Sequence, residues 1–98
     1  MLFIIHCIDK PGALETRQKV RPQHLDYLTK AGKAVVFAGP ILAEDGKTVR
    51  GSLIVADAKD KRAAEAFAQG DPYNKAGIFA SVEISPTRAA FANPPPTG

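Results

Sequence analysis

The residues best able to do chemistry lie in a segment near residue 20. Arg17, Arg21 and His24 are spaced by four and three residues, so a continuous helix places them on one stripe. Two cations then flank an imidazole, the side chain that most readily exchanges a proton near neutral pH. A distant segment, Asp71-Pro72-Tyr73, offers a carboxylate and a phenol. The residue types indicate acid–base chemistry, provided that the fold brings the two segments together.

Each segment also has a purely structural interpretation. His24 can lie half-exposed beside Leu28 while the two arginines solvate a helix surface. Asp71 directly before Pro72 is typical of a helix start, with the aspartate as the cap and the proline at the first helical position. The residues alone leave both interpretations open.

Two more residues with reactive side chains lie in the first apolar segment. His6 stands on a mainly apolar face, where a histidine is usually a hydrogen-bonded core residue. Cys7 lies inside the same segment, where a cysteine is usually a buried, inert small hydrophobe. This disfavours a hydrolase in which Cys7 is the nucleophile and His24 its base. We expect structural roles for His6 and Cys7.

The composition excludes several classes of protein. The 98 residues suffice for one domain with one modest core, and 45% hydrophobic with 23% charged residues is ordinary for a globular protein. The net charge of +3 is small and its lysines and arginines are spread along the chain, which argues against nucleic acid as a partner. The single cysteine cannot form an internal disulfide, and no cysteine spacing for structural zinc occurs. We therefore expect no metal, no cofactor and a reducing compartment.

The N-terminal segment predicts a strand. Residues 2–9 are rich in branched and aromatic side chains and stop at Asp9-Lys-Pro-Gly12, where proline and glycine break regular structure. The segment is too short to span a bilayer and lacks the features of a signal peptide, so we expect a cytoplasmic protein with no membrane partner. Both faces of the strand are largely apolar, and one pair of helices covers only one face. We expect a second copy of the chain to cover the other, as a homodimer.

A helix and two strands are predicted next. Residues 13–31 have helical periodicity and end at Gly32, while Pro22 predicts either a kink or a new helix that begins there. Strands are expected at 33–42 and 50–56, joined by a turn at 44–46. Gly39-Pro40 interrupts the first of these strands, which indicates a bulge or an unpaired edge.

The second half of the chain repeats the alternation. A helix is expected at 58–69, capped by Asp57 and terminated by Gly70, followed by a strand at 77–84. The order of strand, helix, strand, strand, helix, strand predicts an α+β, ferredoxin-like βαββαβ fold with a four-stranded antiparallel sheet and both helices on one face. We expect one domain over residues 1–86. Residues 87–98 end in a proline-rich stretch and predict an extended or flexible tail.

Several motifs occur together in an order that resembles the YCII-related, or YciI-like, family. The resemblance runs from residue 1 to about residue 86, and it rests on the joint order and spacing of its parts. These are the apolar opening strand with Asp9-Lys-Pro-Gly12, Arg17 with Arg21-Pro22-x-His24-Leu25, Ala38-Gly39-Pro40, Gly51-Ser52 and Asp71-Pro72-Tyr73.

The resemblance implies a fold, a site and a class of chemistry. The fold is a ferredoxin-like dimer of the dimeric α+β barrel type, similar in architecture to muconolactone isomerases. The site is a His-Asp dyad, which falls on His24 and Asp71 here. An activity associated with the family is dehydrochlorination of a chlorinated hydroxyquinol. The resemblance thus implies lyase, dehydrochlorinase or isomerase-like proton transfer on a small anionic or phenolic substrate.

In this scheme His24 is the base, and Asp71 fixes its tautomer and stabilises the imidazolium. Arg17 and Arg21 hold an anionic group of the substrate, and Ser52 or Tyr73 supplies a neutral hydrogen bond. The competing expectation is a non-catalytic small-ligand-binding or oligomerisation domain, in which the dyad only stabilises a helix end. Catalysis requires an imidazole nitrogen exposed in a cleft, whereas the structural alternative predicts a filled, dry site.

Overall fold

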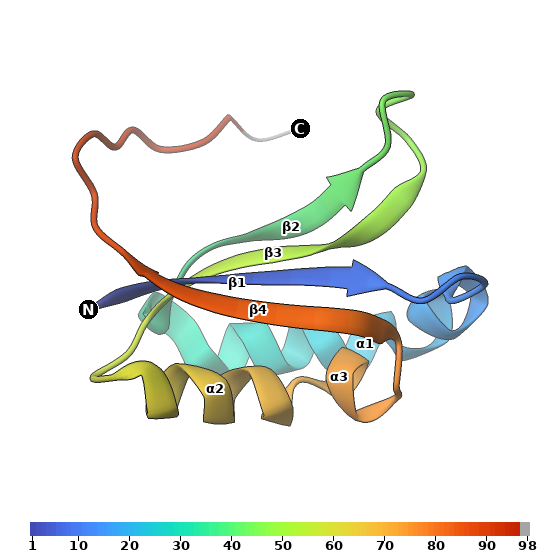
Figure 1. Cartoon of the computed structure of the whole chain (residues 1–98), viewed down its shortest axis with the longest axis horizontal. Helices are drawn as coiled ribbons and strands as arrows, with labels where there is room; N and C mark the ends of the chain where they lie inside the picture. The colour runs from blue at the N-terminus through green and yellow to red at the C-terminus, as the bar shows by residue number, and fades with distance from the viewer. Residues whose placement is uncertain (97–98) are drawn as a thin grey trace.

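The computed structural model describes residues 1–96 and shows four strands with helices on one face of the sheet (Figure 1). The strands pair antiparallel throughout, in the order β2-β3-β1-β4. The elements are β1 (Leu2–Asp9), α1 (Leu14–Ala31), the 3₁₀ turn η1 (Gly32–Ala34), β2 (Val35–Leu42), β3 (Val49–Asp57), α2 (Lys61–Gly70), α3 (Pro72–Lys75) and β4 (Phe79–Thr87). The predicted ferredoxin-like α+β fold is confirmed.

The two faces of the sheet differ sharply in burial. Side chains of β1 and β3 that point toward the helices form the core, among them Phe3, Ile5, Cys7, Ile54 and Ala56. Their neighbours along β1 point to the opposite face and are exposed or half-buried. The strand parity read from the sequence therefore holds, and the helices cover only one of the two apolar faces.

His6 lies on the face opposite the helices and is exposed. Its cross-strand neighbours are Leu53 on β3 and Glu83 on β4. The expectation of a hydrogen-bonded core histidine is therefore wrong for this chain. Parity places His6 on the face with Leu2, Ile4 and Ile8, and the helices pack on the other one.

Pro22 lies inside α1, which runs as one helix from Leu14 to Ala31. The alternative of a new helix beginning at Pro22 is wrong, although the proline still removes one backbone donor. Gly32 ends the helix as predicted, with a φ of 61° and its amide donating to the carbonyls of Leu28 and Thr29. An uninterrupted α1 keeps the segment that carries the arginines and the histidine on a single rigid element.

The N-terminal cap of α2 is Asp60, not Asp57. The Asp60 carboxylate accepts the amide of Ala63 at 2.8 Å, so the helix begins at Lys61. Asp57 remains the last residue of β3, and its carboxylate pairs with the N-terminal amine at 2.8 Å. The prediction of Asp57 as the cap is therefore wrong, because pairing of β3 with β1 extends the strand through that residue.

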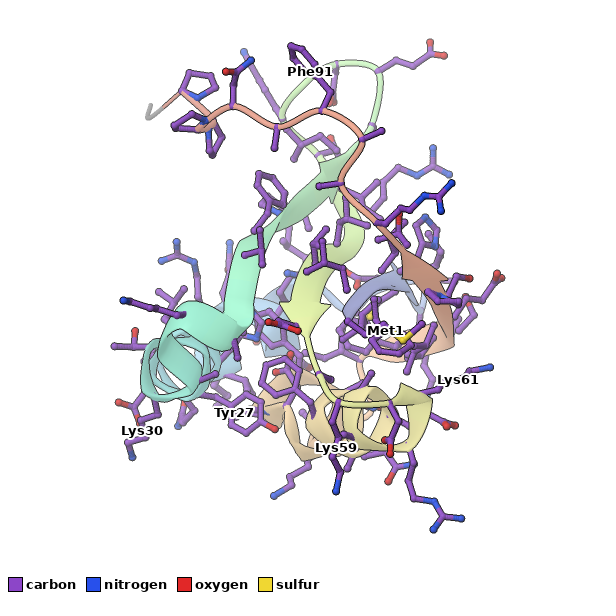
Figure 2. All side chains as sticks on the ribbon, turned by 90° about the vertical axis from the view of Figure 1, so that its left-hand side faces the viewer. Met1, Tyr27, Lys30, Lys59, Lys61 and Phe91 are labelled. Carbon is purple, nitrogen blue, oxygen red and sulfur yellow. The ribbon has the colours of Figure 1, made fainter. Side chains whose placement is uncertain are left out.

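Helices α1 and α2 meet at Tyr27, which lies between them in Figure 2. Its hydroxyl donates to the carbonyl of Phe67 at 2.8 Å, and the two rings stack with centroids 5.1 Å apart. A Cβ atom at Gly70 would collide with the Tyr27 hydroxyl. Glycine at the end of α2 thus permits the close approach of the helices that carry the site.

The interrupted strand β2 lies at an edge of the sheet. Pro40 pairs in register with Ser52, and the two shifts in pairing occur elsewhere, near Val35 and near Leu42. Of the two predicted explanations for Pro40, the edge position therefore holds, because a proline whose nitrogen faces the open side of an edge strand removes no ladder hydrogen bond.

Strand β4 is longer than predicted and continues to Thr87, because Ser85, Pro86 and Thr87 pair with the first residues of β1. Residues 88–96 follow without regular secondary structure and run on the side of the sheet away from the helices (Figures 1 and 2). Phe91 in this stretch is 87% exposed. The last two residues of the expected tail lie outside the described part. Within residues 1–96, no helix combines the length and apolar character that a bilayer span requires.

Candidate active site

The structure brings His24 and Asp71 together although 47 positions separate them. The Nδ1 atom of His24 lies 2.8 Å from Oδ1 of Asp71, and the two residues are 7% and 2% exposed. His24 comes from the middle of α1, and Asp71 from the junction between α2 and α3. The contact expected for a dyad is present in the folded chain.

Asp71 is also a helix cap. The same Oδ1 atom accepts the amide of Tyr73 at 2.9 Å, and Pro72 occupies the first turn of the short helix α3. A proline is tolerated there because the first amides of a helix have no partner within it. The two interpretations of Asp71 are thus compatible, since one carboxylate caps α3 and holds the imidazole. The structural interpretation of His24 as half-exposed, beside two arginines that solvate the helix, is wrong, because His24 and Arg17 are each 7% exposed.

The ring of Tyr73 fixes the plane of the imidazole. The two rings stack with centroids 3.9 Å apart and an angle of 12° between their planes. Asp71 occupies Nδ1, which leaves Nε2 as the free nitrogen of His24. In residues 1–96 every fully buried side-chain nitrogen or oxygen has a partner. His24 also borders a pocket between α1 and the sheet, so Nε2 is the nitrogen open to a bound molecule.

Arg17 is buried and already engaged by the protein. Its Nε and Nη2 atoms donate to the two carboxylate oxygens of Asp9 at 2.9 and 3.1 Å. Nη2 also donates to the hydroxyl of Ser52 at 2.7 Å, and the guanidinium lies 4.5 Å from the centre of the Tyr73 ring. Arg17 therefore ties together β1, α1 and β3, and Asp9 neutralises its charge.

Asp9 was not among the residues that the sequence singled out for the site. Its position in Asp9-Lys-Pro-Gly12 explains the omission, because that pattern is typical of a turn. The available signal was an aspartate eight positions before Arg17, at the end of a strand that leads directly into α1.

Arg21 is exposed one helical turn after Arg17 and borders the same pocket. Burial raises the pKa of the Tyr73 phenol, and the nearby charges of Arg17 and Arg21 lower it in part. The phenol therefore stays protonated at neutral pH and can act as a neutral donor. The pocket thus contains a cation that faces solvent and a neutral hydroxyl group.

The pocket has a volume of about 380 Å³ and lies between α1 and the β2–β3 side of the sheet. It contains five of the six residues predicted for the site, and Asp71 lies behind His24. The sequence did not indicate Gln18 or the apolar part of the wall. The apolar part of the wall is formed by three leucines of α1, three residues of β2 and one of β3: Leu14, Leu25, Leu28, Ala38, Gly39, Pro40 and Val49. An open pocket beside the imidazole is what the catalytic expectation requires, and the filled site of the structural alternative does not describe it.

Cys7 lies in the core beneath this cluster and is inert. Burial, followed by the charge of Asp71, raises the pKa of its thiol to about 12. The thiolate, which is the nucleophilic form, is therefore negligible at neutral pH. The structural role expected for Cys7 agrees with its place in the core. In residues 1–96 no three His, Cys, Asp or Glu side chains gather as a metal site requires.

One solved structure is similar to this chain in both fold and sequence. It is the 5-chloro-2-hydroxyhydroquinone dehydrochlorinase TftG from Burkholderia phenoliruptrix, in complex with 2,5-dihydroxybenzoquinone. The TM-score is 0.82 with 32% sequence identity, covering 90% of this chain and 94% of that one.

The sequence comparisons agree with the structural one. Protein YciI of Escherichia coli O6:H1 is 35% identical over 99 residues, which cover 93% of this chain and all of the relative. An uncharacterized protein of Haemophilus influenzae is 35% identical over 98 residues with the same coverage. The family model described as the YCII-related domain matches residues 1–88. With a match along almost its entire length, this chain belongs to the YCII-related domain family.

Proposed function

We propose that this protein is a small-molecule enzyme that transfers a proton, with His24 as the general base and Asp71 as its orienting carboxylate. The observation that carries the proposal is the position of the imidazole. Its Nδ1 atom is bonded to a buried carboxylate at 2.8 Å, while the ring borders a pocket of about 380 Å³. A base held in one tautomer next to an open cavity is the arrangement that proton abstraction needs.

The proposed chemistry follows from the two ring nitrogens. Nδ1–H donates to Asp71, so the lone pair of the neutral ring is on Nε2 and faces the pocket. Nε2 takes a proton from the substrate, and the carboxylate stabilises the imidazolium that results. Return of the proton to another atom completes an isomerisation, and departure of a leaving group such as chloride completes an elimination.

The pocket favours a small ring compound with an anionic or phenolic oxygen. Its wall is largely apolar, Arg21 offers a cation, and Tyr73 and Ser52 offer hydroxyl groups. The similar enzyme TftG is named for a chlorinated hydroxyhydroquinone and holds 2,5-dihydroxybenzoquinone. This similarity supports a lyase, dehydrochlorinase or isomerase-like reaction on a substrate of the same kind.

We also propose a cytoplasmic homodimer in which the second copy covers the sheet face opposite the helices. That face presents half-buried Leu53 and Val55 and an exposed Phe37 to solvent. The single buried cysteine suits a reducing compartment. Residues 1–86 form the functional unit in this proposal, since none of residues 88–96 borders the pocket.

Replacing His24 by Ala tests the base. With 5-chloro-2-hydroxyhydroquinone as the substrate and chloride release as the readout, we expect turnover to fall by roughly 10²- to 10⁴-fold. His24 is 7% exposed and is bonded to the buried Asp71, so the variant also loses stability, and turnover is compared at a temperature at which urea denaturation shows that it is folded. Turnover equal to that of the wild type would remove His24 as the base. Binding without turnover by the wild-type protein would support the alternative of a ligand-binding domain.

Replacing Asp71 by Asn separates the orienting role from the capping role. Asparagine caps a helix about as well as aspartate, so α3 should persist. The charge that stabilises the imidazolium is lost, and turnover should fall markedly. Asp60→Asn is the matched control, because Asp60 caps α2 in the same way without contacting His24. Equal turnover in the two Asn variants would leave Asp71 as a cap only.

A further inference from the structure

Ser52 holds a hydroxyl hydrogen that no described group accepts. The residue is 4% exposed, and its Oγ atom lies 2.7 Å from Nη2 of Arg17. A guanidinium only donates, so Ser52 is the acceptor in this bond. Within residues 1–96 no acceptor pairs with the hydroxyl hydrogen itself. Ser52 borders the pocket that His24 also borders, so this hydrogen is available to a molecule bound there.

The position of Ser52 is fixed by the surrounding contacts. Arg17 donates to both carboxylate oxygens of Asp9, which locks the guanidinium in one orientation. Strand β3 supplies the serine at a position paired with Cys7 in the centre of the sheet. Accepting a bond from a cation also polarises the hydroxyl group and makes it a stronger donor. The result is a rigid donor that needs no rearrangement to bind an oxygen atom.

Ser52 and the proposed base belong to one continuous wall. The ring of Tyr73 lies 3.9 Å from the His24 ring, and the Arg17 guanidinium lies 4.5 Å from the centre of the same phenol ring. Arg17 then reaches Ser52 at 2.7 Å. A small substrate in the pocket can therefore face Nε2 of His24 and the Ser52 hydroxyl at the same time.

We propose that Ser52 is the oxyanion donor of the site, an inference that rests on the proposed function. When Nε2 takes a proton from a carbon next to a carbonyl group, the C–H electron pair forms a carbon–carbon double bond. The carbonyl π pair moves to oxygen, which becomes an enolate, and the proton remains on the imidazolium. Ser52 donates to that oxygen where the charge develops. The substrate class is therefore a ring ketone with a hydrogen on the carbon next to its carbonyl group, which includes the keto tautomer of a phenol.

This proposal gives Arg17 a different role from the substrate anchor expected from the sequence. Its Nε and Nη2 donors are used by Asp9 and Ser52, and its charge is balanced. Arg17 is then a positioning residue, and Arg21 remains as the cation for a substrate anion. Arg17→Lys keeps the charge but loses the two-pronged bond to Asp9. A positioning role predicts a lower kcat with KM within about twofold, whereas a substrate anchor predicts a higher KM.

The direct test compares Ser52→Ala with Ser81→Ala. Ser81 is an exposed serine on β4 that lies outside the pocket, and its pairing with Ile8 places it on the open sheet face, so sedimentation is used to check that Ser81→Ala keeps the oligomeric state of the wild type. For Ser52→Ala we expect kcat with 5-chloro-2-hydroxyhydroquinone to fall by about 10²- to 10³-fold. Binding of 2,5-dihydroxybenzoquinone, measured by calorimetry, should weaken about 10-fold. Ser81→Ala should match the wild type in both measurements.

A second variant covers the case in which Ser52→Ala does not fold. Ser52→Cys is nearly isosteric and leaves a sulfur atom near Arg17, but its thiol is a much weaker donor. It should fold and lose most of kcat. Wild-type kcat and probe affinity in either folded variant would overturn the role of Ser52, and so would failure of the wild-type protein to bind 2,5-dihydroxybenzoquinone.

The outcomes also separate this inference from the proposed function. If His24→Ala is inactive while Ser52→Ala behaves as the wild type, the oxyanion donor is wrong and the base stands. If His24→Ala turns over normally while Ser52→Ala binds the probe weakly, the base is wrong and Ser52 remains a ligand contact only.

Discussion

The two faces of strand β1 show what burial demands of a polar group. On the helix side, Asp9 at the end of the strand pairs with a buried Arg17 through two hydrogen bonds. On the other side, His6 stands exposed among Leu2, Ile4 and Ile8. Burying an ion pair is costly unless hydrogen bonds compensate for the lost water, and Arg17 on the covered face donates to both Asp9 and Ser52. The open face has apolar side chains with no helix above them.

This difference suggests two uses for the two faces. The hydrogen-bonded polar cluster beneath the helices can hold an imidazole and a hydroxyl group in fixed positions beside a pocket. An apolar sheet face without a cover is suited to association with another protein surface. Substitutions that alter one face at a time can test this division, because the two faces share strands but not side chains.

The largest effect is expected from Asp9→Ala on the covered face. It leaves the Arg17 charge buried without its carboxylate, which should reduce the free energy of unfolding by about 3–5 kcal/mol. Urea denaturation measures this loss. Asp57→Ala is the matched control, since it breaks an ion pair to the N-terminal amine whose two side chains are 59% exposed. That control should cost at most about 1 kcal/mol. Similar losses in the two variants would mean that the burial of Arg17 contributes little.

Leu53→Lys tests the open face. Leu53 is half-buried on β3 opposite His6, outside the buried core cluster, so the monomer should still fold. In the proposed homodimer the substitution places a lysine from each copy in the apolar interface, which should weaken the dimer by about 100-fold or more. Sedimentation equilibrium at micromolar concentration measures the change. Ala66→Lys on the exposed side of α2 adds the same charge and should leave the dimer intact. A wild-type monomer under these conditions would remove the proposed interface.

The sequence predicted the fold well because its local signals agree with one another. Strand alternation, the helical period of α1 and the glycine at its end place the elements in the correct order. The errors have tertiary causes. Asp57 and Asp60 are both good caps, and only the pairing of Asp57 with Leu2 assigns the first of them to β3. Likewise, parity placed His6 on a face but did not say which face the helices cover.

The site was harder to predict from the sequence than the fold. The spacing of Arg17, Arg21 and His24 on one helix was readable, but the contact between His24 and Asp71 spans 47 positions and followed from family resemblance. The engagement of Arg17 by Asp9 and Ser52 depends on three elements meeting in space. Periodicity indicates which face of an element a residue occupies, but it does not indicate which distant residue contacts it.

The smallest effect is expected at the tip of the β2–β3 hairpin, where a carboxylate is well bonded but not buried. The Thr48 hydroxyl and the amides of Thr48 and Lys47 donate to Asp45 at 2.6 to 2.8 Å. These bonds lower the pKa of Asp45 from 3.8 to about 2, with the Thr48 hydroxyl as the first cause. A lowered pKa in the folded state means that the ionised form stabilises the turn above pH 3.8. This contribution is lost as the pH falls from 3.8 toward 2.

The Thr48 amide resonance should therefore titrate with a midpoint near 2, as measured by NMR. Asp45→Asn should keep the turn, since asparagine makes the same kind of turn, and should abolish this titration. A midpoint near 3.8 would show that solvent competes effectively with these bonds at an exposed carboxylate, in contrast to the buried side chains of Asp9 and Asp71.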